Sequence, residues 1–265
     1  MTDTSTPAHW EVYAVRFGRH RLPRSAFYLN YAGYGEPDGD LTMDYYLWLV
    51  RGPAGTIVVD TGFAPEAGRR RGREVLADPV AVLAELGVDA STVPTVVVTH
   101  AHYDHIGNLH RFPAAEVVMS RREYAFWQGP FAGRAHFAIP TEPAELALLP
   151  ELFEEGRLTL VGAQHRLAPG VELLEVGGHT PGQLIVVVRG AAGTAVLASD
   201  AIHSYEEYER DRPFAIVADV AGMYRAYDRI RELERQPGTS VVAGHDPEVM
   251  TRFTPHLPGT VCRVL

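Results

Sequence analysis

The sequence predicts a mixed α/β (α+β) fold in which two β-sheets pack together and helices cover their outer faces. Three observations predict this class. Short apolar runs rich in β-branched residues recur along the chain, some of these runs are apolar on both faces, and helical patterns follow groups of strands. The 265 residues, of which 46% are hydrophobic, suffice to bury a full core. Because no segment has the composition of a linker, we expect a single domain over residues 1–265.

Ten runs have the composition of strands, and Gly, Pro or Asp residues bound them. Residues 95–99 and 184–188 are apolar on both faces, so we expect these two strands inside a sheet that is covered on both sides. In chain order the predicted strands are residues 12–17, 45–50, 56–60, 95–99, 116–119, 158–161, 171–176, 184–188, 195–198 and 240–243.

Three helices have recognisable ends or faces. Asp78 and Pro79 form an N-cap followed by a first-turn proline, and Gly87 ends that helix. Ser120 and Glu123 have the spacing of a capping box, in which each side chain bonds the other residue's backbone N–H. The longest predicted helix covers residues 219–235. Its apolar stripe consists of Met223, Ala226, Tyr227, Ile230 and Leu233.

Composition excludes several classes of function. The formal net charge of −9 disfavours nucleic-acid binding. The absence of lysine excludes a lysine Schiff base and a phosphate-binding P-loop. A single cysteine, Cys262, excludes an intrachain disulfide and a cysteine-rich zinc knuckle. Residues 1–10 lack the apolar core of a signal peptide, and no apolar run is long enough to span a membrane, so we expect a cytoplasmic protein.

Histidine and aspartate cluster directly after the predicted strand 95–99. His100 and His102 are two residues apart, so on an extended chain their side chains point to the same side. Asp104 and His105 follow as the chain turns. Neutral imidazole and carboxylate are ligands that Zn²⁺ accepts. One such histidine would be typical of a structural loop residue, whereas four such side chains after a buried strand indicate a metal site.

Three later residues occupy matching positions. His179 follows the predicted strand 171–176, Asp200 follows 195–198, and His245 follows 240–243. If these strands end on the same edge of the sheets, their loops bring all seven residues together. The joint pattern therefore predicts one metal centre built from four separate parts of the chain.

With these seven residues the sequence resembles the metallo-β-lactamase superfamily, which implies an αββα sandwich of two mixed β-sheets flanked by helices. The resemblance also implies two metal ions. His100, His102 and His179 would hold one, Asp104, His105 and His245 the other, and Asp200 would bridge them. Asp60, in the turn Asp-Thr-Gly, would support the ligands from behind. We expect two Zn²⁺ ions, with iron, manganese or cobalt as alternatives.

Within that superfamily the sequence is most similar to the N-acyl-homoserine lactonases and the related 4-pyridoxolactonase, over about residues 12–249. The segment Gly-His-Thr-Pro-Gly-Gln at 178–183 and the dipeptide Pro-Phe at 213–214 carry this resemblance with the ligands. It implies a hydrolase that opens a lactone, an N-acyl-homoserine lactone or a related small lactone, by attack of a hydroxide held between the metals. Asp104 would pass a proton to the leaving group.

The sequence departs from those lactonases three residues after Asp200. They commonly carry a tyrosine there that contacts the substrate carbonyl, and this chain has His203. We expect His203 to donate a hydrogen bond to the carbonyl or oxyanion in its place. Aromatic residues in the nearby loops are candidates for lining a substrate pocket. These candidate substrate contacts are Phe27, Tyr28, Tyr31, Phe63, Tyr103, His136 and Phe137.

Other functions fit the same ligands. A glyoxalase II-like thioester hydrolase needs the same metals and nucleophile, and a mononuclear iron dioxygenase or a noncatalytic metal-binding protein also remains open. The net charge and the absence of a signal peptide disfavour a nuclease and a secreted β-lactamase. The expected partner is a small lactone or ester, with no nucleic acid and no membrane, and the family resemblance suggests a homodimer.

Overall fold

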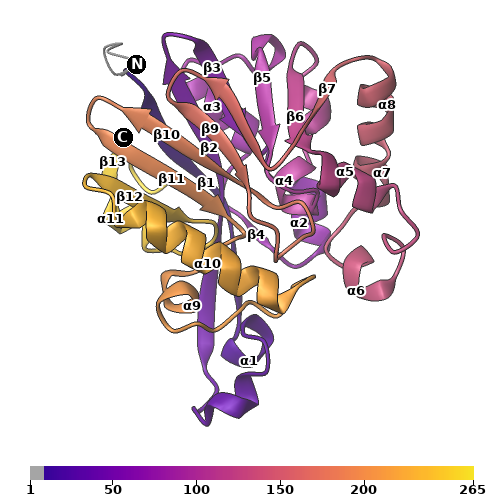
Figure 1. Cartoon of the computed structure of the whole chain (residues 1–265), viewed down its shortest axis with the longest axis vertical. Helices are drawn as coiled ribbons and strands as arrows, with labels where there is room; N and C mark the ends of the chain where they lie inside the picture. The colour runs from indigo at the N-terminus through magenta and orange to yellow at the C-terminus, as the bar shows by residue number, and fades with distance from the viewer. Residues whose placement is uncertain (1–8) are drawn as a thin grey trace.

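Two β-sheets stack face to face and helices cover their outer sides, as the computed structural model of residues 9–265 reveals (Figure 1). The predicted class is therefore confirmed. Residues 1–8, which belong to the segment expected to lack a signal peptide, lie outside the described residues. Within residues 9–265, no helix combines the length and the apolar character that crossing a membrane requires.

The first sheet is mixed and has nine strands. Its order is β13 (Thr254–Leu257), β14 (Val261–Arg263), β1 (Glu11–Pro23), β2 (Asp40–Gly52), β3 (Gly55–Val59), β5 (Thr95–Val98), β6 (Glu116–Ser120) and β7 (Leu158–Val161), with β4 (Glu74–Val75) paired to β1. The strands from β3 to β7 along this order are parallel to one another.

The second sheet has five strands. Its order is β12 (Thr239–Ala243), β11 (Gly193–Ser199), β10 (Leu184–Gly190), β9 (Val171–Glu175) and β8 (Gln164–Ala168). Only β11 and β12 run parallel. All ten predicted strands are present, whereas β4, β8, β13 and β14 were not predicted.

Most helices are short and lie on the outside of the sheets (Figure 1). They are α1 (Arg24–Phe27), α2 (Pro65–Arg70), α3 (Pro79–Glu85), α4 (Tyr103–Ile106), α5 (Arg121–Trp127), α6 (Ala135–Ala138), α7 (Pro143–Leu146), α8 (Leu148–Glu154), α9 (Tyr205–Glu209), α10 (Val220–Glu234) and α11 (Val249–Arg252). The single-turn 3₁₀ helices are η1 (Tyr31–Tyr34), η2 (Ala90–Thr92) and η3 (Leu109–Arg111).

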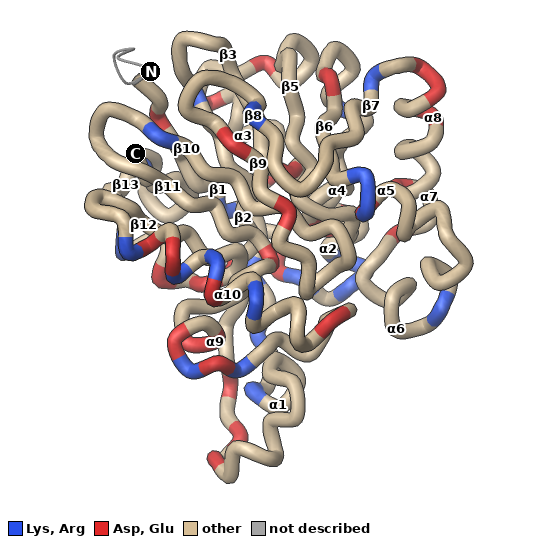
Figure 2. The backbone as a smooth tube through the Cα atoms, viewed as in Figure 1, with Lys and Arg blue, Asp and Glu red and all other residues tan. Residues whose placement is uncertain are grey.

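The predicted helix ends are confirmed at α3 and α10. The Asp78 side chain accepts the backbone N–H groups of Val80 and Ala81 at the start of α3, and Pro79 is its first residue. Helix α10 buries the whole predicted stripe against the second sheet. Figure 2 shows acidic and basic residues mixed along α9 and α10, so α10 combines a buried apolar face with a charged outer one.

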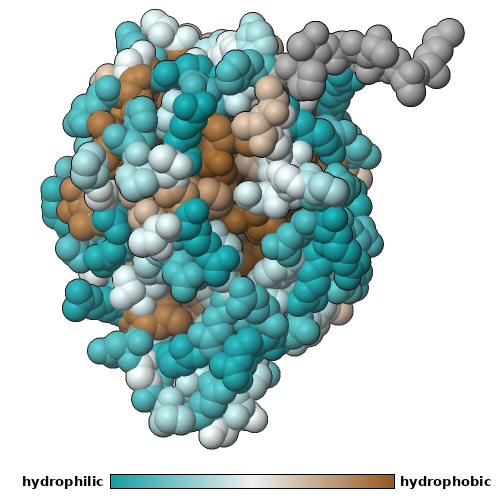
Figure 3. Space-filling view, turned by 90° about the vertical axis from the view of Figure 1, so that its left-hand side faces the viewer, coloured by the Kyte–Doolittle hydropathy of each residue, from teal (hydrophilic) through white to brown (hydrophobic). Residues whose placement is uncertain are grey.

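Two apolar layers hold the sheets and helices together. Alternate residues of β2 point to opposite faces, so Trp48 lies between the two sheets while Leu47 and Leu49 lie under the helices outside the first sheet. Burial on both faces explains why the central strands are apolar throughout. On the side seen in Figure 3, hydrophobic residues appear as separate patches bounded by hydrophilic ones.

Candidate metal centre

All seven predicted ligands lie together, in the segments that follow β5, β9, β11 and β12, with Asp104 and His105 in the short helix α4. They form two groups in which the candidate ligand atoms lie within 4.8 Å of one another, and every member is buried. The first group is His100, His102, His179 and Asp200, and the second is Asp104, His105 and His245. The topology therefore brings residues from four separate segments to one place.

Asp200 lies between the two groups. Its Oδ2 is 3.3 Å from His179 Nε2 and 3.6 Å from His100 Nε2. Its Oδ1 is 3.1 Å from the Nε2 atoms of both His105 and His245. A carboxylate with one oxygen toward each group has the geometry to bridge two cations.

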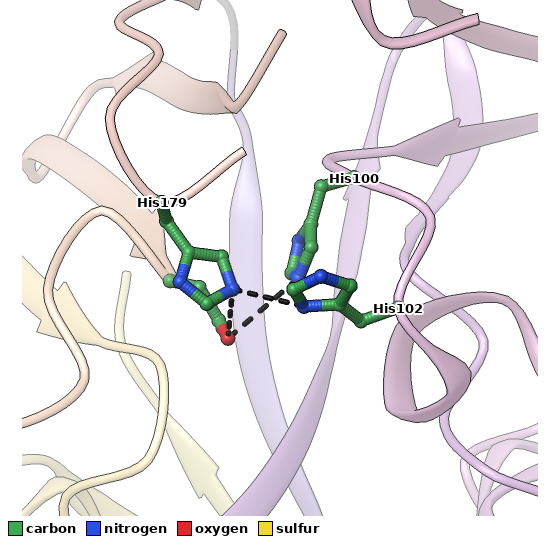
Figure 4. A group of neighbouring side chains, drawn as sticks. His100, His102 and His179 are labelled. Atoms are coloured by element: carbon green, nitrogen blue, oxygen red, sulfur yellow. Dashed lines mark hydrogen bonds and ion pairs between the residues drawn. The ribbon is translucent and has the colours of Figure 1, made fainter. Parts of the chain in front are cut away.

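The rings of His100, His102 and His179 converge from two sides of the site (Figure 4). His179 Nε2 lies 2.9 Å from His102 Nδ1. Burial lowers the pKa of His102 to about 3 and holds the pKa values of His100 and His179 well below their usual range. These imidazoles are therefore neutral, which leaves the lone pairs that a cation needs.

In three of the ligand histidines, Nδ1 lies within hydrogen-bonding distance of an oxygen atom, while Nε2 is the nitrogen directed at the metal centre. This arrangement fixes the ring orientation and the tautomer of a metal-binding histidine. The pairs are His105 Nδ1 with Asp60 Oδ2 at 2.8 Å, His179 Nδ1 with the Ile216 carbonyl at 2.9 Å, and His245 Nδ1 with the Asp44 carbonyl at 2.9 Å.

Asp60 joins this centre through two other bonds. It accepts the backbone N–H and the hydroxyl of Thr99, each at 2.8 Å, directly before His100. Asp60 has a φ of 60° and Ser199, directly before Asp200, has a φ of 46°. Such left-handed backbone at non-glycine residues costs energy and persists where the surroundings fix it. Both strained residues adjoin the candidate ligands.

The residues fit a pair of divalent metal ions. The Nε2 atoms of His100 and His105 are buried, and although both lie near Asp200, neither forms a hydrogen bond of acceptable geometry with a described residue. Buried nitrogens usually have partners, so these two point to a ligand. Five imidazoles and two carboxylates without a thiolate suit zinc, and also iron, manganese or cobalt.

Glu123 connects the two loops that carry the first ligand group, and sequence reasoning missed this role. Its fully buried carboxylate accepts the backbone N–H of Ala101, between His100 and His102, at 3.0 Å. The other oxygen accepts the N–H of Gly182 at 2.9 Å, three residues after His179. A buried carboxylate in bonds of this kind positions both loops.

The predicted capping box at the start of α5 is wrong in one half. The Ser120 hydroxyl accepts the N–H groups of Arg122 and Glu123, as expected. The Glu123 side chain instead turns inward, to the two loops and to Trp127 Nε1 at 2.7 Å. A Cβ on Gly182 would lie 2.2 Å from the Glu123 backbone nitrogen, so this contact needs glycine. Local spacing cannot reveal such long-range acceptors.

His203 is fully buried beside the ligands. Its Nε2 lies 3.2 Å from Asp200 Oδ2, its Nδ1 lies 3.2 Å from Glu207 Oε2, and its ring stacks on Phe214 with the centroids 3.9 Å apart. Burial alone would lower the pKa of His203, but Glu207 and Asp200 raise it to about 9. Glu207 also forms a capping box with Ser204 at the start of α9, a sequence signal that we overlooked.

A cavity of about 200 Å³ opens beside the ligands. Five of its lining residues belong to the ligand groups: His102, Asp104, His179, Asp200 and His245. The others are His20, Leu22, Ala26, Met43, Tyr45, Arg73, Tyr103, Pro140, His203, Phe214 and Ile216. The space suits a small molecule, with apolar and polar walls close to the candidate metals.

Of the predicted substrate contacts, Tyr103 lines this cavity. Phe27, Tyr28 and Tyr31 are not among its lining residues; they form an apolar cluster with Met43 and Phe214, which do line it. Phe63 is also absent from the lining. It packs between Phe17, Tyr45 and Tyr103 in the core outside the first sheet.

His136 and Phe137 line a second, smaller pocket beside the histidine ligands. This pocket includes His102 and His179 and has a volume of about 10 Å³. His136 Nε2 lies 2.9 Å from the Val217 carbonyl. These two residues therefore adjoin the metal ligands without lining the larger cavity.

The sequence pattern described as the metallo-beta-lactamase superfamily matches residues 45–245. That range runs from within β2 to His245, so it includes the second sheet, the strands of the first sheet from β3 to β7 and all seven candidate ligands. The match covers well over half of the chain.

Individual relatives are similar along much of their length. The N-acyl homoserine lactonase AttM of Azorhizobium caulinodans is 31% identical over 186 residues, which is 66% of each chain. An N-acyl homoserine lactonase of a Bacillus species is 25% identical over 253 residues, 90% of this chain and 94% of its own. A solved structure of a quorum-quenching N-acyl homoserine lactone lactonase superposes with a TM-score of 0.79 at 22% identity, covering 96% of this chain and 99% of the other.

Proposed function

Since this chain belongs to the metallo-β-lactamase superfamily, we propose that it is a metal-dependent hydrolase that opens lactones, an N-acyl homoserine lactone or a related small lactone. One observation carries the proposal. The two oxygens of Asp200 face two separate groups of ligands, and both groups border one cavity. This arrangement suits the hydrolysis of an ester beside two metal ions.

Two Zn²⁺ ions are the proposed cofactors. His100, His102 and His179 would hold one, Asp104, His105 and His245 the other, and Asp200 would contact both. When bound, such a pair lowers the pKa of water toward neutrality and polarises an ester carbonyl. Asp60 keeps the His105 ring in place and Glu123 keeps the first two ligand loops together.

His203 is the proposed contact to the substrate carbonyl. Glu207 accepts both its backbone N–H, at 2.7 Å, and its ring Nδ1–H. The stack on Phe214 holds the ring plane, and Nε2 lies 3.2 Å from Asp200 Oδ2 in the wall of the cavity. A donor held in this way stabilises an oxyanion without rearranging during the reaction.

Asp104 is the proposed proton carrier. Its side chain lines the cavity, and its Oδ2 lies 3.7 Å from the Nε2 atoms of His105 and His245. A carboxylate oxygen at this position can take a proton and pass it to the ring oxygen that leaves when the lactone opens. Tyr103, which adjoins Asp104 in the chain, is the proposed aromatic contact to the substrate.

The relatives favour a lactone over the thioester of a glyoxalase II-like hydrolase, because those described above are lactonases. The cytoplasmic location, the homodimer and the identity of the metal stay predictions from the sequence. The direct role of the aromatic residues outside the cavity, Phe27, Tyr28, Tyr31 and Phe63, also stays a prediction.

A substrate panel tests the proposal. We would load the protein with zinc and follow proton release from acyl homoserine lactones, simple γ-lactones and aromatic lactones, with thioesters alongside. We expect turnover of one lactone group and its loss in Asp104→Ala, with the fold unchanged by circular dichroism. Turnover of thioesters alone would contradict the proposal. Unfolding of Asp104→Ala together with metal loss would indicate a structural site instead.

A further inference from the structure

Arg73 is the one arginine among the residues that line the cavity beside the candidate metals. It lies between the turn at Gly72 and strand β4, and its backbone N–H donates to the Gly68 carbonyl at 2.8 Å. The next two residues, β4 itself, pair with β1. The backbone on both sides of Arg73 is therefore fixed, and its side chain reaches the cavity from a set position.

No carboxylate of residues 9–265 lies within 4.0 Å of the Arg73 guanidinium; its only side-chain hydrogen bond runs from Nε to the Tyr103 hydroxyl, at 2.9 Å. The neighbouring arginines differ. Arg70 and Arg71 both pair with Glu142 at 2.7 Å. Arg73 is thus set apart from the arginines of the same segment.

An arginine that is half-buried without a carboxylate partner has lost hydration without gaining an ion pair. Its guanidinium keeps its charge at every physiological pH and offers five N–H donors. Only the Nε–H of Arg73 bonds a described residue, so the two terminal NH₂ groups have donors to spare. Their planar fork matches a carboxylate.

The wall around Arg73 adds a second hydrogen-bond donor. The Tyr103 hydroxyl donates to the Tyr45 hydroxyl at 3.3 Å, which leaves the Tyr45 hydrogen for another acceptor. Burial and the charge of Arg73 lower the pKa of His20 on the same wall to about 4, so His20 is neutral. The two acids that line the cavity, Asp104 and Asp200, are candidate metal ligands.

We infer that Arg73 and Tyr45 form a subsite for a carboxylate carried by the substrate, so that the lactone opened here bears an acidic group. This inference rests on the proposed function. Tyr103 adjoins Asp104 in the chain, which places the subsite next to the ligands. An acidic lactone would supply the carboxylate partner that the guanidinium lacks among residues 9–265, whereas a neutral lactone would leave its terminal NH₂ groups without an ionic partner.

The test compares a γ-lactone that carries a carboxylate on its ring with the matching carboxamide, using the zinc-loaded protein. We expect wild type to prefer the acid by at least about 10-fold in kcat/KM, the order expected for a charged hydrogen bond. In Arg73→Met this preference falls to near 1, mainly through KM, and Arg73→Lys retains part of it. Arg70→Met, which changes an exposed arginine of the same segment, keeps the wild-type preference. Melting curves check that each variant folds.

A binding measurement separates the inference from the proposed function. Calorimetry follows the two ring-opened products, one with the extra carboxylate and one with the amide, on wild type and Arg73→Met. Tighter binding of the acid by wild type alone supports the subsite, even if neither lactone is hydrolysed and the proposed function fails. Turnover of both lactones with equal kcat/KM, or equal binding of both products, overturns the subsite.

Discussion

The Nδ1 atom of His203 lies 3.2 Å from a carboxylate oxygen of Glu207, one helical turn further along the chain. The same carboxylate also accepts the His203 backbone N–H. Glu207 is itself held by the N-cap of α9, through the Ser204 hydroxyl, and it is fully buried. The ring of His203 is therefore fixed by a side chain that is part of a helix end rather than by a mobile loop.

Replacement of His203 by alanine should lower kcat. A preorganised donor at an oxyanion contributes about 100- to 1,000-fold in rate, and KM should change less. The tyrosine variant, His203→Tyr, should retain more activity than alanine because its hydroxyl can reach the same side. Steady-state kinetics with metal analysis of each variant checks this. Unchanged turnover in His203→Ala at full metal content would remove His203 from the reaction.

Replacement of Glu123 by glutamine should weaken the metal held by His100, His102 and His179. In wild type each oxygen of the Glu123 carboxylate accepts one backbone N–H. Glutamine replaces one of these oxygens with an NH₂ group, so one of the two loops loses its acceptor. Supporting residues of this kind change metal affinity by about 10- to 100-fold. Competition with a chelating dye measures the affinity. Glu172→Gln, in an exposed pair with Arg189, serves as the control and should bind metal like wild type.

The variant Asp60→Asn should weaken chiefly the other metal, because Asp60 bonds the ligand His105 directly but reaches His100 only through the preceding Thr99. His105 would lose the carboxylate that accepts its Nδ1–H at 2.8 Å, and an amide is a poorer acceptor for that group. We expect about a 10- to 100-fold loss at the group of Asp104, His105 and His245. A stepwise titration with metal distinguishes the two effects. Each variant should weaken a different one of the two metal-binding steps. An equal loss of both metals in both variants would contradict separate support.

Glu145 gives the protein a pH-dependent stability. Burial, Glu142 and Asp104 raise the pKa of its carboxyl from 4.5 to about 8, against a smaller opposite effect of Arg71 and Arg70. Its Oε2 is buried without a hydrogen-bond partner among the described residues. Between these two pKa values the folded protein holds a proton that the unfolded chain has released. Stability therefore falls as the pH rises from about 4.5 to about 8.

The variant Glu145→Gln removes this titration. Its melting temperature relative to wild type should rise steadily from pH 5 to pH 8, by the equivalent of about 3 kcal/mol at most, and then level off above that pH. Thermal melts in a series of buffers at constant ionic strength measure it. Glu151→Gln, at an exposed position of α8, should show no such trend. A pH-independent offset for Glu145→Gln would mean that this carboxyl titrates normally.

Sequence patterns revealed the strands whose own residues are apolar and missed those that depend on a partner. All ten predicted strands are runs of mainly apolar residues. Strand β8, residues 164–168, is partly exposed and polar, and it exists because β9 pairs with it at the edge of the second sheet. Strand β4 is two residues long and likewise depends on β1. Composition alone cannot report a pairing of this kind.

The aromatic residues illustrate a second limit. Phe63 follows the Asp-Thr-Gly turn and Tyr103 lies within the histidine–aspartate cluster, yet Phe63 packs in the core and Tyr103 lines the cavity. The hydrophobic effect is not directional, so the sequence alone does not distinguish an aromatic ring in the core from one in the wall of the cavity. Only the packing of neighbouring elements decides which ring meets the core and which meets a ligand.

By itself the sequence determined the strands and the residue types that end them. The spacing of hydrophobic residues and the histidines at the ends of strands are local features of the sequence. His100, His102 and His245 could therefore be named as candidate metal ligands from the sequence alone. Tertiary structure decided how these residues meet. Asp200 lies between two ligand groups, Glu123 bonds two distant loops, and Arg73 faces the cavity without a carboxylate partner in residues 9–265. Each of these relationships depends on sheet pairing and packing across many residues, which leave no local trace in the sequence.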